Sequence, residues 1–172
     1  ITPDYDAMRL QFENGKIQLA QFSAYLYARM KKTTTIHALV RQRLRTNVKH
    51  RGVFIVAEAS PLKSLSDLKN TRFSYVDSAS SSGYIFPRLA IRKAGLNPDT
   101  LFRTTQFAGS HSDVVRLVQQ KQVDAGVVSE LTLETKTGLR RIATTDNVPD
   151  DTIVASDALD QEQRQLLHRF FL

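Results

Sequence analysis

The chain has 172 residues, enough for one ordinary domain or two small lobes, and 41% of them are hydrophobic and 24% charged. This composition is typical of a globular protein with a buried core, and no apolar run approaches the roughly 18–20 residues of a membrane span. The absence of cysteine excludes disulfide scaffolds, cysteine nucleophiles and thiolate metal sites. The chain begins with Ile1 and has no basic-then-apolar leader, so we expect a removed targeting segment or a piece of a longer protein.

The formal net charge of +7 is unevenly distributed along the chain. Eight basic residues and no acidic one lie between Arg29 and Arg51, whereas residues 143–172 carry a net charge of −4. A basic run can bind nucleic acid or another polyanion, but such sites also use aromatic platforms, and this run contains no Phe, Tyr or Trp. We therefore interpret the run as a solvated helix end and loop, and keep a polyanion binder as an alternative. No nucleic-acid partner is expected.

Turn residues and hydrophobic periodicity predict the elements of the first part of the chain. A helix is expected over 2–15, because its opening Thr-Pro pair is a typical helix start and its closing Asn-Gly pair a typical stop. A strand over 17–22 and a helix over 23–30 follow. The continuous β-branched run Gly52–Ala57 predicts a strand covered on both faces, and the S-x-x-D pattern of Ser64–Asp67 predicts a short helix.

Strands and helices then alternate to the end of the chain. The strands are expected over 72–76, 103–107, 123–128, 141–145 and 152–155, and the helices over 87–94, 114–121 and 160–172. Such alternation predicts an α/β fold with mainly parallel sheets. We expect two lobes, a first lobe over 1–70 and 145–172 and a second over 71–144, with crossings near 69–72 and 142–147.

Three polar turns begin expected helices, at Thr2–Tyr5, Ser78–Gly83 and Gly109–Ser112. In open α/β sheets ligands bind outside the carboxyl ends of the strands, where the N–H groups of helix N-termini favour an anion. Hydroxyl side chains in the second turn, a Gly83 that permits close backbone approach, and the imidazole of His111 add to this set. The pattern indicates a small tetrahedral oxyanion that is held without being transformed. Each turn also has a plainer interpretation, as a helix cap or a loop.

Patterns that indicate catalysis are missing from the sequence. Ser110 and His111 are neighbours at a turn, so their side chains diverge and cannot form a nucleophile–base pair. No hydrolase elbow, zinc-protease helix motif or phosphate-binding P-loop occurs, and the four histidines show no ligand spacing. Asp77, Asp113 and Asp124 are interpreted as caps and strand-end residues. We expect no enzymatic activity, no metal and no cofactor.

Three ordered motifs carry a more specific signal. They are the serine-rich S-G-Y-x-x-P turn of Asp77–Arg88, the G-S-H turn of Phe107–Val115 and the V-D-A-G of Gln122–Val127. With these motifs in register, the chain closely resembles the phosphate/phosphite/phosphonate-type periplasmic solute-binding proteins of ABC transporters. The lead-in at 64–69 and the opening at 3–8 fit the same pattern, so the resemblance covers nearly the whole chain.

The resemblance implies a two-lobed, type II Venus-flytrap fold that holds a small phosphorus oxyanion in its cleft. It also implies a periplasmic or other extracytoplasmic location and an ABC transporter permease as partner, with no membrane insertion by this segment. The ligand-binding residues that it implies are Tyr5, Tyr27, Ser80, Ser81, Ser82 and His111. The serines resemble the family's hydroxyl and N–H cradle, the histidine its imidazole donor, and the tyrosines its side chains from the other lobe.

The chain also departs from the family pattern. Where the family usually reads D-x-A-W-L-G-P, this chain has Gln18–Ala24, so the first-lobe wall differs and the identity of the oxyanion stays open. The family pattern places an opening strand and helix ahead of Thr2, so we expect either a truncated chain or a further segment outside these 172 residues, and an incomplete first lobe without it. A second hypothesis is therefore an extracytoplasmic sensor domain of the same fold, in a signalling protein such as a histidine kinase. Transmembrane helices and a cytoplasmic transmitter after Leu172 in the full reading frame would favour it.

Overall fold

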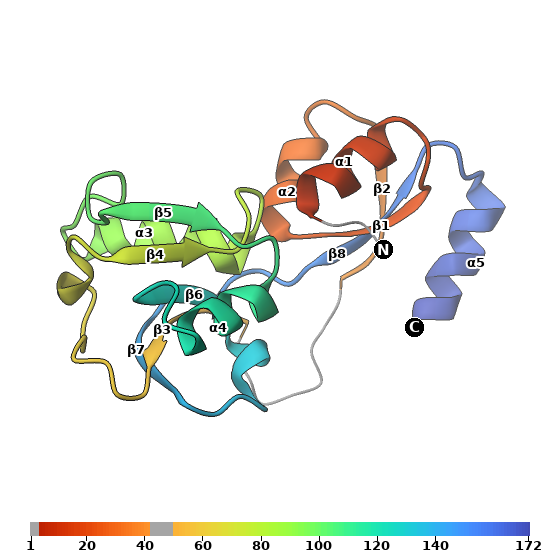
Figure 1. Ribbon diagram of the computed structural model, residues 1–172. Helices are drawn as coiled ribbons and strands as arrows, with labels where there is room; N and C mark the ends of the chain where they lie inside the picture. Colours follow the sequence, from red (N-terminus) through yellow and green to blue (C-terminus); the bar gives the residue numbers. More distant parts are fainter. Residues whose placement is uncertain (1–3, 42–49) are drawn as a thin grey trace. The chain divides into compact units, whose positions relative to one another are not determined.

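The computed structural model describes residues 4–41 and 50–172. The chain divides into two compact units (Figure 1). Unit 1 consists of residues 1–45 and 149–172, and unit 2 of residues 46–148. Unit 2 is therefore one continuous segment inserted between the two parts of unit 1.

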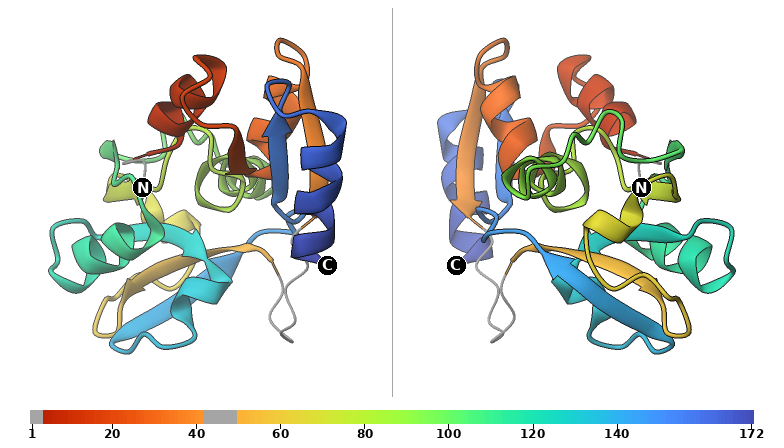
Figure 2. Two further views of the ribbon diagram at one scale, coloured as in Figure 1. Left: turned by 90° about the vertical axis from the view of Figure 1, so that its right-hand side faces the viewer. Right: turned by 90° about the vertical axis from the view of Figure 1, so that its left-hand side faces the viewer.

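Unit 1 is built on a three-stranded antiparallel sheet with the order β1-β8-β2. Its elements are α1 (Tyr5–Glu13), β1 (Leu19–Phe22), α2 (Ala24–Met30), β2 (Ile36–Arg41), β8 (Thr152–Ser156) and α5 (Gln161–Phe171). β8 is the central strand, and its Val154 and Ala155 are completely buried. The last helix, α5, lies alongside β2 (Figure 2), where His168 Nδ1 is 2.7 Å from the carbonyl oxygen of Leu39.

Short polar side chains begin the helices of unit 1, as expected for N-caps. The Asp4 carboxylate accepts a hydrogen bond from the Ala7 N–H at 2.7 Å and begins α1. The cap expected at residues 2–3 lies outside the described residues. Ser23 caps α2, and Asp160 forms a capping box at the start of α5.

Unit 2 contains a five-stranded mixed sheet with the order β5-β4-β6-β3-β7. Its strands are β3 (Gly52–Ala57), β4 (Arg72–Tyr75), β5 (Thr104–Phe107), β6 (Ala125–Ser129) and β7 (Leu139–Thr144). Its helices are the 3₁₀ turn η1 (Ser66–Leu68), the π turn η2 (Ser81–Ile85), α3 (Phe86–Lys93), α4 (His111–Gln119) and the 3₁₀ turn η3 (Glu130–Leu133). β4 runs parallel to β5 and β6, whereas β3 runs antiparallel to β6 and β7.

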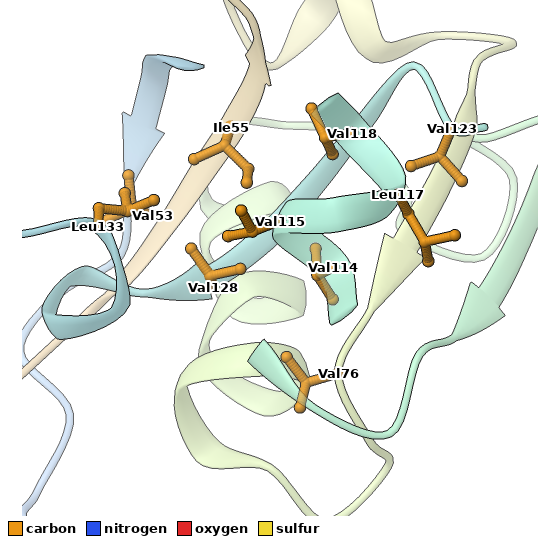
Figure 3. Close-up of a cluster of buried hydrophobic side chains, with 10 residues drawn as sticks. All are labelled: Val53, Ile55, Val76, Val114, Val115, Leu117, Val118, Val123, Val128 and Leu133. Carbon is orange, nitrogen blue, oxygen red and sulfur yellow. The ribbon is translucent and has the colours of Figure 1, made fainter. Parts of the chain in front are cut away.

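Unit 2 buries apolar side chains on both faces of this sheet. Successive residues of β3 alternate between the faces: Val53 and Ile55 pack toward α4 (Figure 3), and Phe54 and Val56 join the cluster that contains Ile91 of α3. The other members of the α4 cluster are Val76, Val114, Val115, Leu117, Val118, Val123, Val128 and Leu133. The prediction that β3 is covered on both faces is confirmed, and each fully buried side chain of this kind contributes about 1.5–3 kcal/mol.

The α/β fold is confirmed, but the expectation of mainly parallel sheets is wrong. The described sheet of unit 1 is wholly antiparallel, and that of unit 2 has parallel pairs only around β4. The reason is the path of the chain. β3 is the first strand of unit 2 and β7 the last, so the strands that enter and leave the unit lie side by side in opposite directions.

The units also begin and end at different residues from those expected. β3 was expected in the first lobe, but it pairs with β6 and β7 and therefore belongs to unit 2. The first crossing consequently lies near 45–46 instead of 69–72, and the return lies at 148–149, just after the expected range. Part of the basic run, residues 42–49, lies outside the described residues.

Candidate functional site

Three turns of unit 2 lie at one edge of its sheet. β4, β5 and β6 are parallel neighbours, so their carboxyl ends point the same way. The serine-rich turn follows β4, the Gly109–Ser110 turn follows β5, and η3 follows β6. This edge is where open α/β sheets bind their ligands.

Val76, the residue after β4, holds two of these turns together. Its N–H donates a hydrogen bond to the Gly83 carbonyl oxygen at 3.2 Å, and its carbonyl oxygen accepts one from the Gly109 N–H at 2.8 Å. The Val76 side chain is completely buried in the cluster beneath α4. We call Ser78–Gly83 the serine turn and Gly109–Ser112 the histidine turn. The two turns are separate in the sequence, and one buried residue, Val76, fixes them next to each other.

The serine turn is buried and winds into α3 through a π turn that the sequence did not predict. Ser80 is its N-cap, and the Ser80 hydroxyl accepts a hydrogen bond from the Gly83 N–H at 3.0 Å. Ser80, Ser81 and Ser82 are 1%, 2% and 4% exposed. Within the described residues neither the N–H nor the hydroxyl of Ser82 makes a hydrogen bond. Ser82 therefore offers two donors at the start of a helix, where orphan N–H groups require partners.

Glycines permit the tight packing of this turn. A Cβ on Gly83 would lie 2.4 Å from Cγ2 of Val76, and a Cβ on Gly52 would lie 2.4 Å from the carbonyl oxygen of Ser82. The sequence analysis interpreted Gly83 as a residue that lets the backbone approach a ligand closely. In the structure a glycine is needed here because the backbone of Gly83 packs against Val76, which brings the turn against the end of β4.

The histidine turn begins α4. Gly109 has a φ of +83°, a conformation that suits glycine, and Ser110 is the N-cap. The Ser110 hydroxyl accepts from the Asp113 N–H at 3.1 Å and donates to the Asp113 carboxylate at 2.7 Å. The N–H groups of His111 and Ser112 make no hydrogen bond within the described residues, so the helix presents donors and the positive end of its dipole at this point.

The His111 ring has a defined tautomer. Its Nδ1 accepts a hydrogen bond from the Ser129 N–H at 2.9 Å, so in the neutral ring the hydrogen is on Nε2. Burial, with a smaller effect from the charge of His50, lowers the pKa of His111 to about 4. At neutral pH the ring is therefore an uncharged donor through Nε2.

Ser129 and Glu130 are residues that the sequence analysis missed. Ser129 ends β6, is 6% exposed, and its hydroxyl has no hydrogen-bond partner within the described residues. The buried Glu130 accepts hydrogen bonds from Arg51 at 2.6 and 2.9 Å and from Arg141 at 2.6 Å. These bonds, chiefly the one from Arg51, lower the pKa of Glu130. The sequence signal for both residues was their position at the carboxyl end of a buried strand, the same position that the other two turns occupy.

The expected tyrosines lie in unit 1. Tyr5 is the first residue of α1 and Tyr27 lies on α2, with Lys31 Nζ 6.0 Å from the centre of the Tyr27 ring. Both are half-buried. Between the two tyrosines, in the segment Gln18–Ala24 that departs from the family pattern, the Gln21 amide donates to the Asp151 carboxylate at 2.9 Å. The structure thus brings Ser80–Ser82 together with His111 within unit 2, and the role of the tyrosines stays a prediction.

The chemistry of the edge is that of a set of hydrogen-bond donors. Ser110 is bonded to Asp113 and His111 to Ser129, so the two neighbours do not bond each other. In residues 4–41 and 50–172 no group of three or more metal-ligating side chains occurs. None of the helices in those ranges is both long enough and apolar enough to span a bilayer. Neutral donors at two helix starts suit an anion with several acceptor oxygens.

Solved structures of binding proteins share this fold. The chain is similar to PhnD1 from Prochlorococcus marinus in complex with methylphosphonate, with a TM-score of 0.85 and 23% identity over 96% of this chain and 68% of that one. It is also similar to a binding protein component of an ABC phosphonate transporter from Pseudomonas aeruginosa, with a TM-score of 0.83 and 23% identity over 99% and 61%. The chain is also similar to the aliphatic sulphonate binding protein SsuA from Escherichia coli, with a TM-score of 0.70 and 20% identity over 98% of this chain and 57% of that one.

The chain spans between 57% and 68% of the length of these three structures, and at these identities they establish the fold. Family membership rests on the sequence as a whole. The sequence profile of the family described as "ABC transporter, phosphonate, periplasmic substrate-binding protein" matches residues 1–172. The resemblance carried by the three motifs is thereby confirmed, and the chain belongs to this family of periplasmic substrate-binding proteins.

Proposed function

We propose that the protein captures a small phosphorus oxyanion outside the cytoplasm and delivers it to the permease of an ABC importer. The observation that carries this proposal is the double bonding of Val76 to Gly83 and Gly109, which sets the serine turn beside the histidine turn. Donors from both turns then converge on one ligand. The family match over residues 1–172 supports the same role.

An oxyanion is favoured because the edge offers several donors and few acceptors. The N–H and hydroxyl of Ser82, the Nε2–H of His111 and the hydroxyl of Ser129 are the principal donors. Hydrogen bonds from such groups to an ionised oxygen are roughly twice as strong as bonds between neutral groups. The guanidinium groups of Arg51 and Arg141 are bound to Glu130, the residue after Ser129. Binding therefore depends on directed hydrogen bonds more than on a neighbouring cation.

The ligand is proposed to be a phosphonate, phosphite or phosphate. A phosphorus oxyanion presents three or more oxygens in a tetrahedral arrangement, which matches donors that arrive from two turns. The methylphosphonate complex of PhnD1 supports this class by analogy of fold. A sulphonate has the same shape, and SsuA has the same fold, so sulfate belongs in the test as a competitor.

Tyr5 and Tyr27 are proposed to complete the site from unit 1. Each carries a phenolic hydroxyl that can donate to an oxyanion, and the resemblance to the family assigns them this role. If they do so, closure of the two units around the ligand would exclude water from the donors of unit 2.

Calorimetric titration tests the proposed function. The 172-residue chain and the full reading frame that contains it are titrated with phosphite, phosphate, methylphosphonate, 2-aminoethylphosphonate and sulfate. At least one phosphorus oxyanion should bind more tightly than sulfate. The absence of binding by all five to folded protein would overturn the proposal.

Substitutions then locate the ligand. His111→Ala should weaken binding by about 1.5–3 kcal/mol, tenfold or more, because the imidazole donor to a charged group is lost. Ser82→Ala should cost about fivefold, since the Ser82 N–H remains. Tyr5→Phe and Tyr27→Phe should each cost about fivefold if unit 1 contributes. Ser112→Ala is the matched control, because its exposed side chain makes no hydrogen bond within the described residues and its N–H is retained.

A further inference from the structure

A hollow of about 270 Å³ in unit 2 is lined by residues of the edge strand β5 and of the helix α3. Aromatic rings and guanidinium groups dominate its wall: Tyr75, Tyr84, Phe102, Phe107, Arg88 and Arg103. None of these side chains is among the donors proposed to hold the oxyanion. The hollow therefore requires an explanation of its own.

The rings form the apolar part of the lining, which also includes Asp99, Thr104 and Thr105. The Tyr75 and Tyr84 rings lie 4.9 Å apart between centres, and the Tyr84 and Phe107 rings 5.2 Å apart, both edge to face. Phe107 is nevertheless 54% exposed, on a strand that pairs only with β4 among the described strands. An exposed ring in contact with other rings presents a surface on which another planar group can stack.

A buried hydroxyl group on this wall lacks an acceptor. The Tyr75 side chain is 2% exposed, and no group within the described residues accepts the hydrogen of its hydroxyl. Burial raises the pKa of this hydroxyl well above its ordinary value, against a smaller lowering by the charge of Arg88 and a hydrogen bond from it, so the hydroxyl stays protonated. Tyr75, Tyr84 and Arg88 all line the hollow. Arg88 can only donate, so it cannot accept the hydrogen of Tyr75.

The two guanidinium groups of the hollow differ in their partners. Arg88 is bound to Asp99 and lies 5.2 Å from the centre of the Tyr84 ring, and Asp99 is also 3.7 Å from Arg92. The carboxylate in the hollow is therefore neutralised. Arg103 has no ion pair or side-chain hydrogen bond within the described residues. Its charge lowers the pKa of Asp124, but that carboxylate is hydrogen-bonded to Arg72.

We propose that this hollow binds a small planar organic anion of the aromatic carboxylate class. The ring of the ligand stacks against Phe107 and Tyr84, and its carboxylate accepts hydrogen bonds from Arg103 and from the Tyr75 hydroxyl. A cation would meet two guanidinium groups in the hollow. A neutral apolar ligand would leave the Tyr75 hydrogen without an acceptor, which is costly for a buried group.

Benzoate is the probe for this proposal. Titrated into the 172-residue chain, it should shift the NMR signals of the Tyr84, Phe102 and Phe107 rings with a Kd on the order of 1 mM, as expected for a ligand of this size. Cyclohexanecarboxylate, which keeps the charge without the planar ring, should bind about fivefold more weakly. Benzamide, which keeps the ring without the charge, should bind about tenfold more weakly.

Conservative variants identify the groups that bind the carboxylate. Tyr75→Phe keeps the ring and removes only the hydroxyl, and Arg103→Gln keeps a polar side chain but removes the guanidinium charge, so each should weaken benzoate binding about fivefold to tenfold. Arg116→Gln, an exposed guanidinium on α4 outside the hollow, is the control and should have no effect. Benzoate affinity that is unchanged by both Tyr75→Phe and Arg103→Gln would overturn the proposal, as would the absence of ring shifts.

A second titration separates this site from the proposed oxyanion site. Methylphosphonate affinity should be the same in Tyr75→Phe as in the unmodified chain, and benzoate affinity should be the same in His111→Ala. If benzoate instead competes with methylphosphonate and its binding is lost in His111→Ala, the carboxylate occupies the turns and the hollow is not a site. That outcome would leave the proposed function standing.

Discussion

The strand β3 of unit 2 and the helix α5 of unit 1 differ in how completely their side chains are buried. In unit 2 the four central residues of β3 are completely buried, two on each face of the sheet. In unit 1 no side chain of α5 is buried, and Leu166 and Phe170 are 62% and 80% exposed. Val76, which joins the two turns of the candidate site, belongs to the core of unit 2. The geometry of these turns therefore depends on core packing in unit 2 and should be insensitive to changes on α5.

Removing a core side chain from unit 2 should have the largest effect. Phe54→Ala deletes a completely buried ring and should lower the free energy of unfolding by about 3–5 kcal/mol. Leu166→Ala, on the exposed side of α5, should change it by less than about 0.5 kcal/mol. Urea unfolding measures both values, and hydrogen exchange assigns the change to a unit. Equal losses from the two substitutions would show that the units do not differ as described.

The half-buried histidine His111 makes the stability of unit 2 depend on pH. The pKa of His111 is about 4 in the folded protein and about 6.5 in an unfolded chain. Between these values only the unfolded chain takes up the proton, so stability falls as the pH is lowered from 6.5 to 4. The expected loss is about 3 kcal/mol across this window, with no further loss from this group below it.

Chemical denaturation at several pH values, compared between the natural chain and His111→Gln, isolates this effect from that of the carboxylates. The difference in the free energy of unfolding between the two chains should change by about 3 kcal/mol from pH 6.5 to pH 4 and stay constant above pH 7.5. Ser112→Ala, at the next position, should follow the natural chain. A difference that does not vary with pH would mean that His111 is not buried as a neutral ring.

The elements with strong local signals were predictable from the sequence. The continuous β-branched run of β3 indicated a strand with both faces covered, and the structure confirms it. The helix α4 was also predicted, but its start was expected at residue 114, whereas Ser110 caps the helix and α4 begins at His111. The signals for both elements act within a few residues, so they do not depend on which segments meet in the fold.

Features that depend on distant segments were not predictable in this way. The antiparallel pairing of β3 with β6 and β7 follows from where the chain enters and leaves unit 2, and the residues of β3 carry no sequence signal for the direction of pairing. Ser129 is a single polar residue at the end of a buried strand, and its importance appears only when its N–H meets His111. The π turn at Ser81–Ile85 depends on the contact between Gly83 and Val76.

A methyl group added to Gly83 should disturb the serine turn. Gly83→Ala would place Cβ 2.4 Å from Cγ2 of Val76 and should cost about 2 kcal/mol or more through overpacking. Gly15→Ala in unit 1 meets no atom within 4 Å, and its φ of +68° alone should cost about 1 kcal/mol. Thermal unfolding compares the two. Only Gly83→Ala should also weaken methylphosphonate binding, and a loss in both variants would contradict the local role of the serine turn.

The smallest expected effect concerns the charges beside Ser129. Glu130→Gln keeps the shape of the side chain but removes the ion pairs with Arg51 and Arg141, both partly exposed, so it should cost about 1 kcal/mol at pH 7. Since the hydrogen bond from Arg51 lowers the pKa of Glu130 in the folded protein, the charged carboxylate stabilises the fold above its unfolded pKa of about 4.5. That contribution is lost as the pH falls through the folded pKa. The free energies of unfolding of the natural chain and of Glu130→Gln, measured in urea, should therefore become equal in acid. The exposed Glu134→Gln provides the control. If the cost of Glu130→Gln persisted unchanged at low pH, it would come from packing at the end of β6, and the turn beside Ser129 would be held by shape instead of charge.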